Sequence, residues 1–225
     1  MCGVTPHAAA TTSLRRPTSL ADALRTRIID GQFAPGTRLS EASLAAQLAV
    51  SRNTLREAFR VLAEQGLVDH VPHRGVSVTS PGMADVVDIY RVRRALECGV
   101  LATTSPRHPG VPAMADAVAV GEAAAADGDW HTAGSANMAF HEAIVALADS
   151  PRLDRSYRNV SAELRLAFLE LADMQGLHEP FVGRNRQLLD CFVTDGASEA
   201  AALLEDYLTD SERMVLGAIA RRDRQ

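Results

Sequence analysis

The spacing of apolar residues changes along this chain of 225 residues, and the change limits its possible folds. From about residue 20 to residue 66, apolar residues recur every three or four positions, as on amphipathic helices. Between residues 67 and 79 they alternate instead, as in short strands. Beyond residue 80 the helical spacing returns and continues to the end of the chain. The pattern predicts a mainly α protein with one β-hairpin near its N-terminal end.

The segments before and through the hairpin predict a winged helix-turn-helix. A first helix stops at Gly31, and a second covers about 41–48. Ser51 is a suitable N-cap for a third helix, which stops at Gly66. Only residues 49–50 separate the second helix from the third. Two helices joined by a tight turn and followed by a hairpin have the order of a winged helix-turn-helix.

Three regions are expected along the chain. Residues 1–17 are rich in Ala, Thr, Ser and Pro and have no apolar period, which predicts a disordered tail. The winged helix-turn-helix takes residues 18–80. The Ser80-Pro81-Gly82 sequence marks a boundary, and residues 81–225 are expected to form an all-helical bundle. Its helices are predicted near 83–103, 113–127, 129–148, 152–173, 179–193 and 198–221.

The composition agrees with a helical protein outside the membrane. Hydrophobic residues make up 47% of the chain but aromatic residues only 4%, so burial depends on Ala, Leu and Val, which suit helix packing. No apolar run is long enough to span a bilayer, and no apolar segment follows the early arginines as in a signal peptide. Cys2, Cys98 and Cys191 lack metal spacing and fit a reducing compartment. A cytoplasmic location is expected.

The charge is distributed unevenly between the two predicted domains. The chain carries a formal net charge of −5. Residues 13–79 hold nine Arg against six Asp and Glu, giving +3, and residues 80–225 hold fourteen against twenty-two, giving −8. A basic N-terminal part joined to an acidic body is typical of a protein with one DNA-facing module.

The third helix exposes polar residues at the end that enters the major groove in a helix-turn-helix. Arg can bond guanine and Asn adenine through two hydrogen bonds, and Ser and Thr hydroxyls suit phosphate oxygens. At the wing tip, Arg suits a narrow minor groove and Gly permits close approach. Any one of these arginines alone could be a solvated surface charge, but the turn, the polar helix end, the buried face and the basic wing occur together. The expected DNA contacts are Ser51, Arg52, Asn53, Thr54, Arg56, Arg74 and Gly75.

These features resemble the DNA-binding signature of the GntR family of bacterial regulators. The matching residues are Gly31, Pro35-Gly36, Leu39-Ser40-Glu41, Leu44-Ala45, Val50-Ser51-Arg52, 55–58, Leu62, Gly66-Leu67 and Arg74-Gly75-Val76. The body resembles the FCD domain of the FadR-like branch through residues 89–97 and 140–144. The resemblance implies the same DNA contacts and adds His73 on the wing. Ala42 stands where some relatives have an arginine, so their operator sequences do not transfer.

The resemblance also bears on metal binding in the helical domain. Many FCD domains hold a divalent metal with an Asp and three His. The corresponding positions here are Asn137, His141, Asn185 and Tyr207, so only His141 is kept. A neutral amide and a phenol are weak ligands for zinc. No metal and no other cofactor are therefore expected.

The same positions suggest a pocket for an organic acid. By the resemblance, the four side chains project towards one point, and Arg93 on the first body helix is available for a carboxylate. A salt bridge from Arg93 to Glu97, four residues on, is the other open possibility for this arginine. The expected effector site consists of Arg93, Asn137, His141, Asn185 and Tyr207.

The expected function is that of a homodimeric transcriptional regulator that binds a palindromic operator in double-stranded DNA and senses a small organic acid. No membrane partner is expected. One alternative is a dimeric regulator without an effector, in which the polar residues of the body are internal packing. Another is an enzyme such as a hydrolase. The chain has no HExxH spacing, no glycine-rich phosphate loop and no nucleophile elbow, so an enzyme is not predicted.

Overall fold

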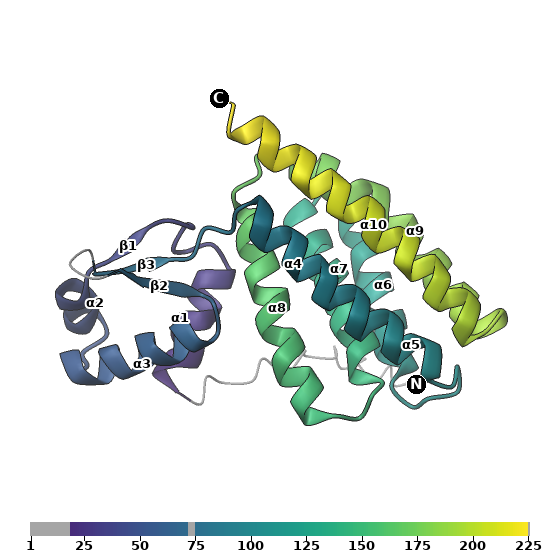
Figure 1. Ribbon diagram of the computed structural model, residues 1–225, viewed down its shortest axis with the longest axis horizontal. Helices are drawn as coiled ribbons and strands as arrows, with labels where there is room; N and C mark the ends of the chain where they lie inside the picture. Colours follow the sequence, from purple (N-terminus) through teal and green to yellow (C-terminus); the bar gives the residue numbers. More distant parts are fainter. Residues whose placement is uncertain (1–18, 72–74, 225) are drawn as a thin grey trace, which may run out of the picture.

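The computed structural model describes residues 19–71 and 75–224, and they form two parts that lie side by side (Figure 1). A small part with three strands and three helices precedes a larger body built from helices. The predicted fold class, a winged helix-turn-helix followed by an all-helical bundle, is confirmed. The expected tail (1–17) and two expected wing residues, His73 and Arg74, lie outside the described residues.

The N-terminal part has the expected helices and one strand more than expected. Its elements are α1 (Leu20–Ile29), β1 (Arg38–Leu39), α2 (Glu41–Gln47), α3 (Arg52–Glu64), β2 (Val68–Val71) and β3 (Gly75–Val78). The predicted hairpin is β2 and β3, and the sheet order is β1-β3-β2 with antiparallel neighbours. The sequence pattern missed β1 because two residues are too few to show an alternation; β1 pairs Arg38 with Ser77.

Local capping explains where these helices begin and end. Ser19, Ser40 and Ser51 each accept a hydrogen bond from the backbone N–H three residues further on, the arrangement of an N-cap serine. Between α2 and α3, Ala49 has a φ of +53°, in the left-handed region that ends a helix abruptly. Leu55 on α3 is buried among the apolar side chains of this part. The tight turn therefore sets the angle of α3 against α2.

The body consists of long helices around one apolar core. Its elements are α4 (Met83–Arg93), the π-helical turn η1 (Arg94–Cys98), α5 (Gly99–Thr103), α6 (Val111–Ala126), α7 (Trp130–Ala146), α8 (Pro151–Leu169), α9 (Met174–Thr194) and α10 (Ala197–Arg222). The helix predicted over 83–103 is thus interrupted by η1. The helix predicted from 179 begins earlier, because the Asp173 side chain accepts a hydrogen bond from the Gly176 N–H and caps the helix there. Pro180 lies inside this helix. No helix in the described ranges has the length and apolar character needed to cross a bilayer.

Helix α8 joins the two parts, and Figure 1 shows it as the body helix beside the N-terminal part. Ala162 and Leu166 on α8 pack into the apolar core of the N-terminal part. Leu164 and Phe168, on the same helix, pack into the core of the body. Helix α8 therefore contributes to both cores, and the two parts share one buried seam.

Candidate functional site

The N-terminal end of α3 is exposed as a DNA-reading helix requires. Ser51, Arg52, Asn53 and Thr54 are exposed, while Leu55 is fully buried. The Ser51 hydroxyl accepts from the Thr54 N–H at 3.0 Å and lies 2.8 Å from the Thr54 hydroxyl, so both hydroxyls help to cap the helix. Within the described part of the chain, the Arg52 and Asn53 side chains have no hydrogen-bond partner. These two side chains are available for base edges.

Arg56 lies on the same exposed end of α3 and is paired in the absence of DNA. Its Nε donates to Glu41 Oε2 on α2 at 2.8 Å, and the Arg56 side chain is 65% exposed. An ion pair this exposed contributes little stability, roughly 0–1 kcal/mol. Arg56 can therefore exchange the Glu41 carboxylate for a phosphate at small cost.

The described part of the wing contains one expected residue and one that the sequence pattern missed. Gly75 begins β3 with a φ of +84°, a conformation that favours glycine. A Cβ placed on Gly75 would lie 3.7 Å from the guanidinium of Arg38, which β1 holds beside β3. Arg38 is exposed and adds a cation at the base of the wing. If the sequence pattern had shown β1 as a third strand, it would have placed Arg38 at the base of the wing.

A polar cluster in the body is centred on Glu97, which is fully buried. Arg93 Nε donates to Glu97 Oε1 at 2.7 Å, and the Tyr157 hydroxyl donates to the same oxygen at 2.6 Å. The Nδ1 atom of His141 lies 2.6 Å from Glu97 Oε2. Arg93 thus forms the salt bridge to Glu97 that its spacing allowed. The sequence pattern missed Tyr157 because nothing on α8 distinguishes it from a core aromatic residue.

The electrostatics of this cluster leave it without net charge. Burial alone would raise the pKa of Glu97, but Arg93 and then His141 lower it from 4.5 to about 2. Burial lowers the pKa of His141 below its usual value despite the neighbouring carboxylate. His141 is therefore neutral at pH 7, and its contact with Glu97 is a hydrogen bond from Nδ1–H. The charges of Arg93 and Glu97 cancel: burial alone would lower the pKa of Arg93, but Glu97 together with Tyr157 and Tyr90 raises it well above its usual value.

The other three expected effector residues form a second hydrogen-bonded group. Asn137 Oδ1 accepts from Asn185 Nδ2 at 2.7 Å and from the Tyr207 hydroxyl at 2.8 Å. The rings of His141 and Tyr207 are 5.0 Å apart, so the two groups are in contact. His141 Nε2 and Asn185 Oδ1 are buried and have no partner among the described residues. A cavity of about 10 Å³ between Arg93, Asn137 and His141 has room for roughly one water molecule.

Comparison with known proteins agrees with this division into a DNA-reading part and a helical body. Residues 18–78 match the family model described as "Bacterial regulatory proteins, gntR family", and residues 88–210 match that of the FCD domain. The chain belongs to the GntR family. The resemblance found in the sequence is confirmed, and this GntR protein is a transcriptional regulator with a DNA-binding domain and an FCD domain.

Individual relatives match most of the chain. An uncharacterized HTH-type transcriptional regulator in an unstable DNA locus of Streptomyces ambofaciens is 32% identical over 187 residues, which are 77% of this chain and 73% of that protein. The crystal structure of a GntR protein from Rhodococcus sp. RHA1 is 39% identical in sequence and has a TM-score of 0.83. The match covers 88% of this chain and 96% of that one. Escherichia coli McbR/YncC is 20% identical with a TM-score of 0.72 over 88% of this chain and 95% of that one, and shares the fold.

Many FCD domains hold a divalent metal, but the side chains at the corresponding positions of this GntR protein do not suit a metal ion. The four positions that the resemblance relates to metal ligands hold one imidazole, two amides and a phenol. Asn137 is bonded to the other amide and to the phenol, and His141 is bonded to Glu97. Within residues 19–71 and 75–224, no group of three or more His, Cys, Asp or Glu side chains could hold a metal ion. Zinc prefers imidazole, thiolate and carboxylate ligands, and this set offers only one of them, the imidazole of His141.

Proposed function

We propose that this GntR protein is a cytoplasmic, non-catalytic regulator that binds a palindromic operator in DNA as a homodimer. In this proposal residues 18–80 read the DNA, and residues 81–225 form the dimer and sense an effector. The observation that carries it is the exposed end of α3, where Arg52 and Asn53 have no partner among the described residues. One helix and one wing contact too little DNA for strong specificity, so a two-fold dimer on a two-fold site is needed.

The proposed DNA contacts come from the two elements expected to touch the duplex. On α3, the side chains of Arg52 and Asn53 read bases, while the remaining polar side chains and the helix N-terminus hold phosphates. The wing adds its contacts at the backbone or the minor groove. The full set is Ser51, Arg52, Asn53, Thr54, Arg56, His73, Arg74 and Gly75.

The substitution Arg52→Ala tests this docking. If Arg52 reads a base, specific operator binding should weaken by about 1–3 kcal/mol. The matched control is Arg60→Ala, which removes another exposed arginine further along α3, one that is paired with Glu57 and Glu64. Titrations with an operator fragment and with a scrambled duplex, at fixed salt, should give two chains per operator. Equal operator affinity for both variants, or one chain per operator, would contradict the proposal.

For the body, the proposal is that a small organic acid binds without a metal among Arg93, Asn137, His141, Asn185 and Tyr207. The carboxylate of the ligand would take the place of the Glu97 carboxylate between Arg93 and His141. Support comes from the pairing itself, because a buried guanidinium and an imidazole already hold one carboxylate there. His141 Nε2 and Asn185 Oδ1, which are buried and have no partner among the described residues, can also hydrogen-bond a polar ligand.

A second candidate function is a dimeric DNA-binding regulator with no effector in this cluster. The observation that favours it is that Glu97 satisfies Arg93, His141 and Tyr157, while the cavity measures only about 10 Å³. In that case the polar side chains specify the packing of the body, and an organic acid finds no unpaired charge there.

Thermal melting separates the two candidates. Acetate, succinate and citrate are screened at constant ionic strength, with and without a chelator. A ligand at about one hundred times its dissociation constant should raise the melting temperature by roughly 5–10 °C, because it binds only the folded state. A rise that His141→Asn removes, and that chelator leaves unchanged, supports metal-free sensing at the cluster. No rise, or a rise that persists in His141→Asn, supports the second candidate.

A further inference from the structure

A cleft of about 260 Å³ opens where the DNA-binding part meets the body. Its walls come from α1 of the DNA-binding part and from α7 and α8 of the body. Met138 and Ser161 line both this cleft and the small cavity of the polar cluster. The charged side chains that line it are Arg25, Asp30, Glu142, Arg158 and Arg165. Three cations thus face two carboxylates in an opening large enough for a small molecule.

None of the three arginines forms an ion pair with a carboxylate of the described residues. Arg25, on α1, donates only to neutral oxygens: Gln65 Oε1 at 3.0 Å, Asn159 Oδ1 at 3.4 Å and the Arg158 carbonyl at 2.5 Å. Arg158 itself is exposed on α8. These guanidinium groups keep their positive charge facing the cleft.

Arg165 is the most deeply buried of the three, with 6% of the residue exposed. Its Nη2 donates to His131 Nε2 at 2.9 Å, and its Nε makes a long contact of 3.4 Å with the Ile29 carbonyl. Its Nη1 is buried without a partner in the part of the chain that the structure describes. A buried donor left without an acceptor destabilises the fold, and a charged one does so more.

The two carboxylates that line the cleft act on the arginines electrostatically but form no ion pair with them. Glu142 Oε1 accepts from the Ser161 hydroxyl at 2.8 Å, and Asp30 is an exposed residue at the C-terminal end of α1. Burial lowers the pKa of Arg25 and of Arg165, and nearby carboxylates, Glu142 for Arg25 and Asp30 for Arg165, offset only part of that shift. The arginines can therefore still take an anion as a direct partner.

We propose that this cleft is a second ligand site, which binds a compact dianion between Arg25, Arg158 and Arg165. Carboxylate and phosphate groups present oxygens that guanidinium binds in the same paired geometry, so a small dicarboxylate and a phosphate ester share the required chemistry. The site is separate from the Glu97 cluster, whose charges cancel. The cleft is also much larger, about 260 Å³ against about 10 Å³ for the cavity at the cluster, so a ligand of several atoms can enter it.

The position of the site gives it a regulatory role, and this step rests on the proposed function. Arg25 belongs to the DNA-binding part, and Arg158 and Arg165 belong to the body. A dianion bound by all three ties α1 to α8 and so holds the reading helix at one angle to the body. If the angle between the reading helix and the body is different when the protein is bound to an operator, the ligand changes the affinity for DNA. DNA then changes the affinity for the ligand by the same factor.

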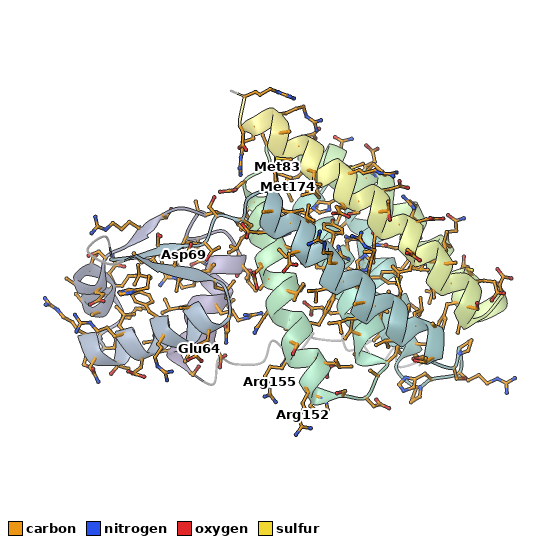
Figure 2. All side chains as sticks on the ribbon, in the orientation of Figure 1. Glu64, Asp69, Met83, Arg152, Arg155 and Met174 are labelled. Carbon is orange, nitrogen blue, oxygen red and sulfur yellow. The ribbon has the colours of Figure 1, made fainter. Side chains whose placement is uncertain are left out.

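Calorimetric titration of the full-length protein without DNA tests the site. Succinate and inorganic phosphate are the probes, and sodium chloride keeps the ionic strength constant. The test variant is Arg158→Gln, and the matched control is Arg155→Gln, one turn earlier on α8 and outside the cleft. Both residues are exposed, and Figure 2 shows Arg155 projecting outward from α8. The two variants remove the same charge from the same helix.

The expected result is saturable binding of at least one probe, weakened at least tenfold by Arg158→Gln and unchanged by Arg155→Gln. Binding of succinate alone indicates a dicarboxylate, and binding of phosphate indicates a phosphate ester. Absence of saturable binding for both probes, or an equal loss in the two arginine variants, overturns the proposal. Because no DNA is present, either outcome is independent of whether the protein binds an operator.

Discussion

Replacing Glu97 with alanine should lower the free energy of unfolding by about 3–5 kcal/mol, the cost of removing one partner of a buried ion pair. The fully buried carboxylate accepts hydrogen bonds from Arg93, His141 and Tyr157. Without it the Arg93 guanidinium, of which 4% is exposed, keeps its charge in a low-dielectric interior with no counter-charge. Urea denaturation at pH 7, followed by circular dichroism, measures the difference.

The matched control is Glu122→Ala, which breaks the exposed pair with Arg186. The side chains of that pair are 40% and 39% exposed, so the loss should stay within about 1 kcal/mol. If Glu97→Ala unfolds at the same urea concentration as Glu122→Ala, the cluster is not a closed ion pair in solution.

The effect of Glu97→Ala should also depend on pH. The pKa of Glu97 is lowered in the folded protein, from 4.5 to about 2. A carboxyl group with a lowered pKa stabilises the fold above its unfolded value and loses that contribution as the pH falls towards the folded value. The difference between wild type and Glu97→Ala should therefore be largest above pH 4.5 and shrink between pH 4.5 and 2. A difference that stays constant over this range would contradict the pKa assignment.

Leu166→Ala should destabilise the protein by about 2–5 kcal/mol, as expected for a fully buried leucine. Leu166 lies on α8 of the body, but its side chain is part of the core of the DNA-binding part. The lost contacts should therefore loosen α1 and α3 more than the body helices.

Leu164→Ala is the matched control, because Leu164 is equally buried on the same helix and packs into the core of the body. Hydrogen exchange measured by mass spectrometry locates the loosened regions. Leu166→Ala should speed exchange in 20–29 and 52–64, and Leu164→Ala in the body. Identical exchange maps for the two variants would show that α8 does not divide its contacts between two cores in solution.

Much of the DNA-binding part follows from short-range sequence signals. The serine caps, the break at Ala49 and the change of apolar period each act within a few residues, so they can be recognised without the fold. Strand β1 could not be recognised in this way. It has two residues, and it exists because it pairs with β3, almost forty positions away.

The polar cluster and the cleft were harder to predict because their members are distant in sequence. The spacing of Arg93 and Glu97 allowed a salt bridge, but nothing local decided between Glu97 and a ligand as the partner. Tyr157 meets Glu97 from sixty positions away. Arg25 and Arg165 have ordinary sequence surroundings, and that neither forms an ion pair within the described residues is visible only once α1 and α8 are placed together.

The seam along α8 has a consequence for recombination among relatives. A crossover at the Pro81-Gly82 linker transfers the reading helices but leaves Ala162 and Leu166, two members of their core, behind in the recipient body. A hybrid regulator therefore folds well only when the recipient α8 presents side chains of matching volume at those two places. The unit that can be inherited intact is not a continuous stretch of chain. It is residues 19–80 together with one face of a helix that lies eighty positions further on.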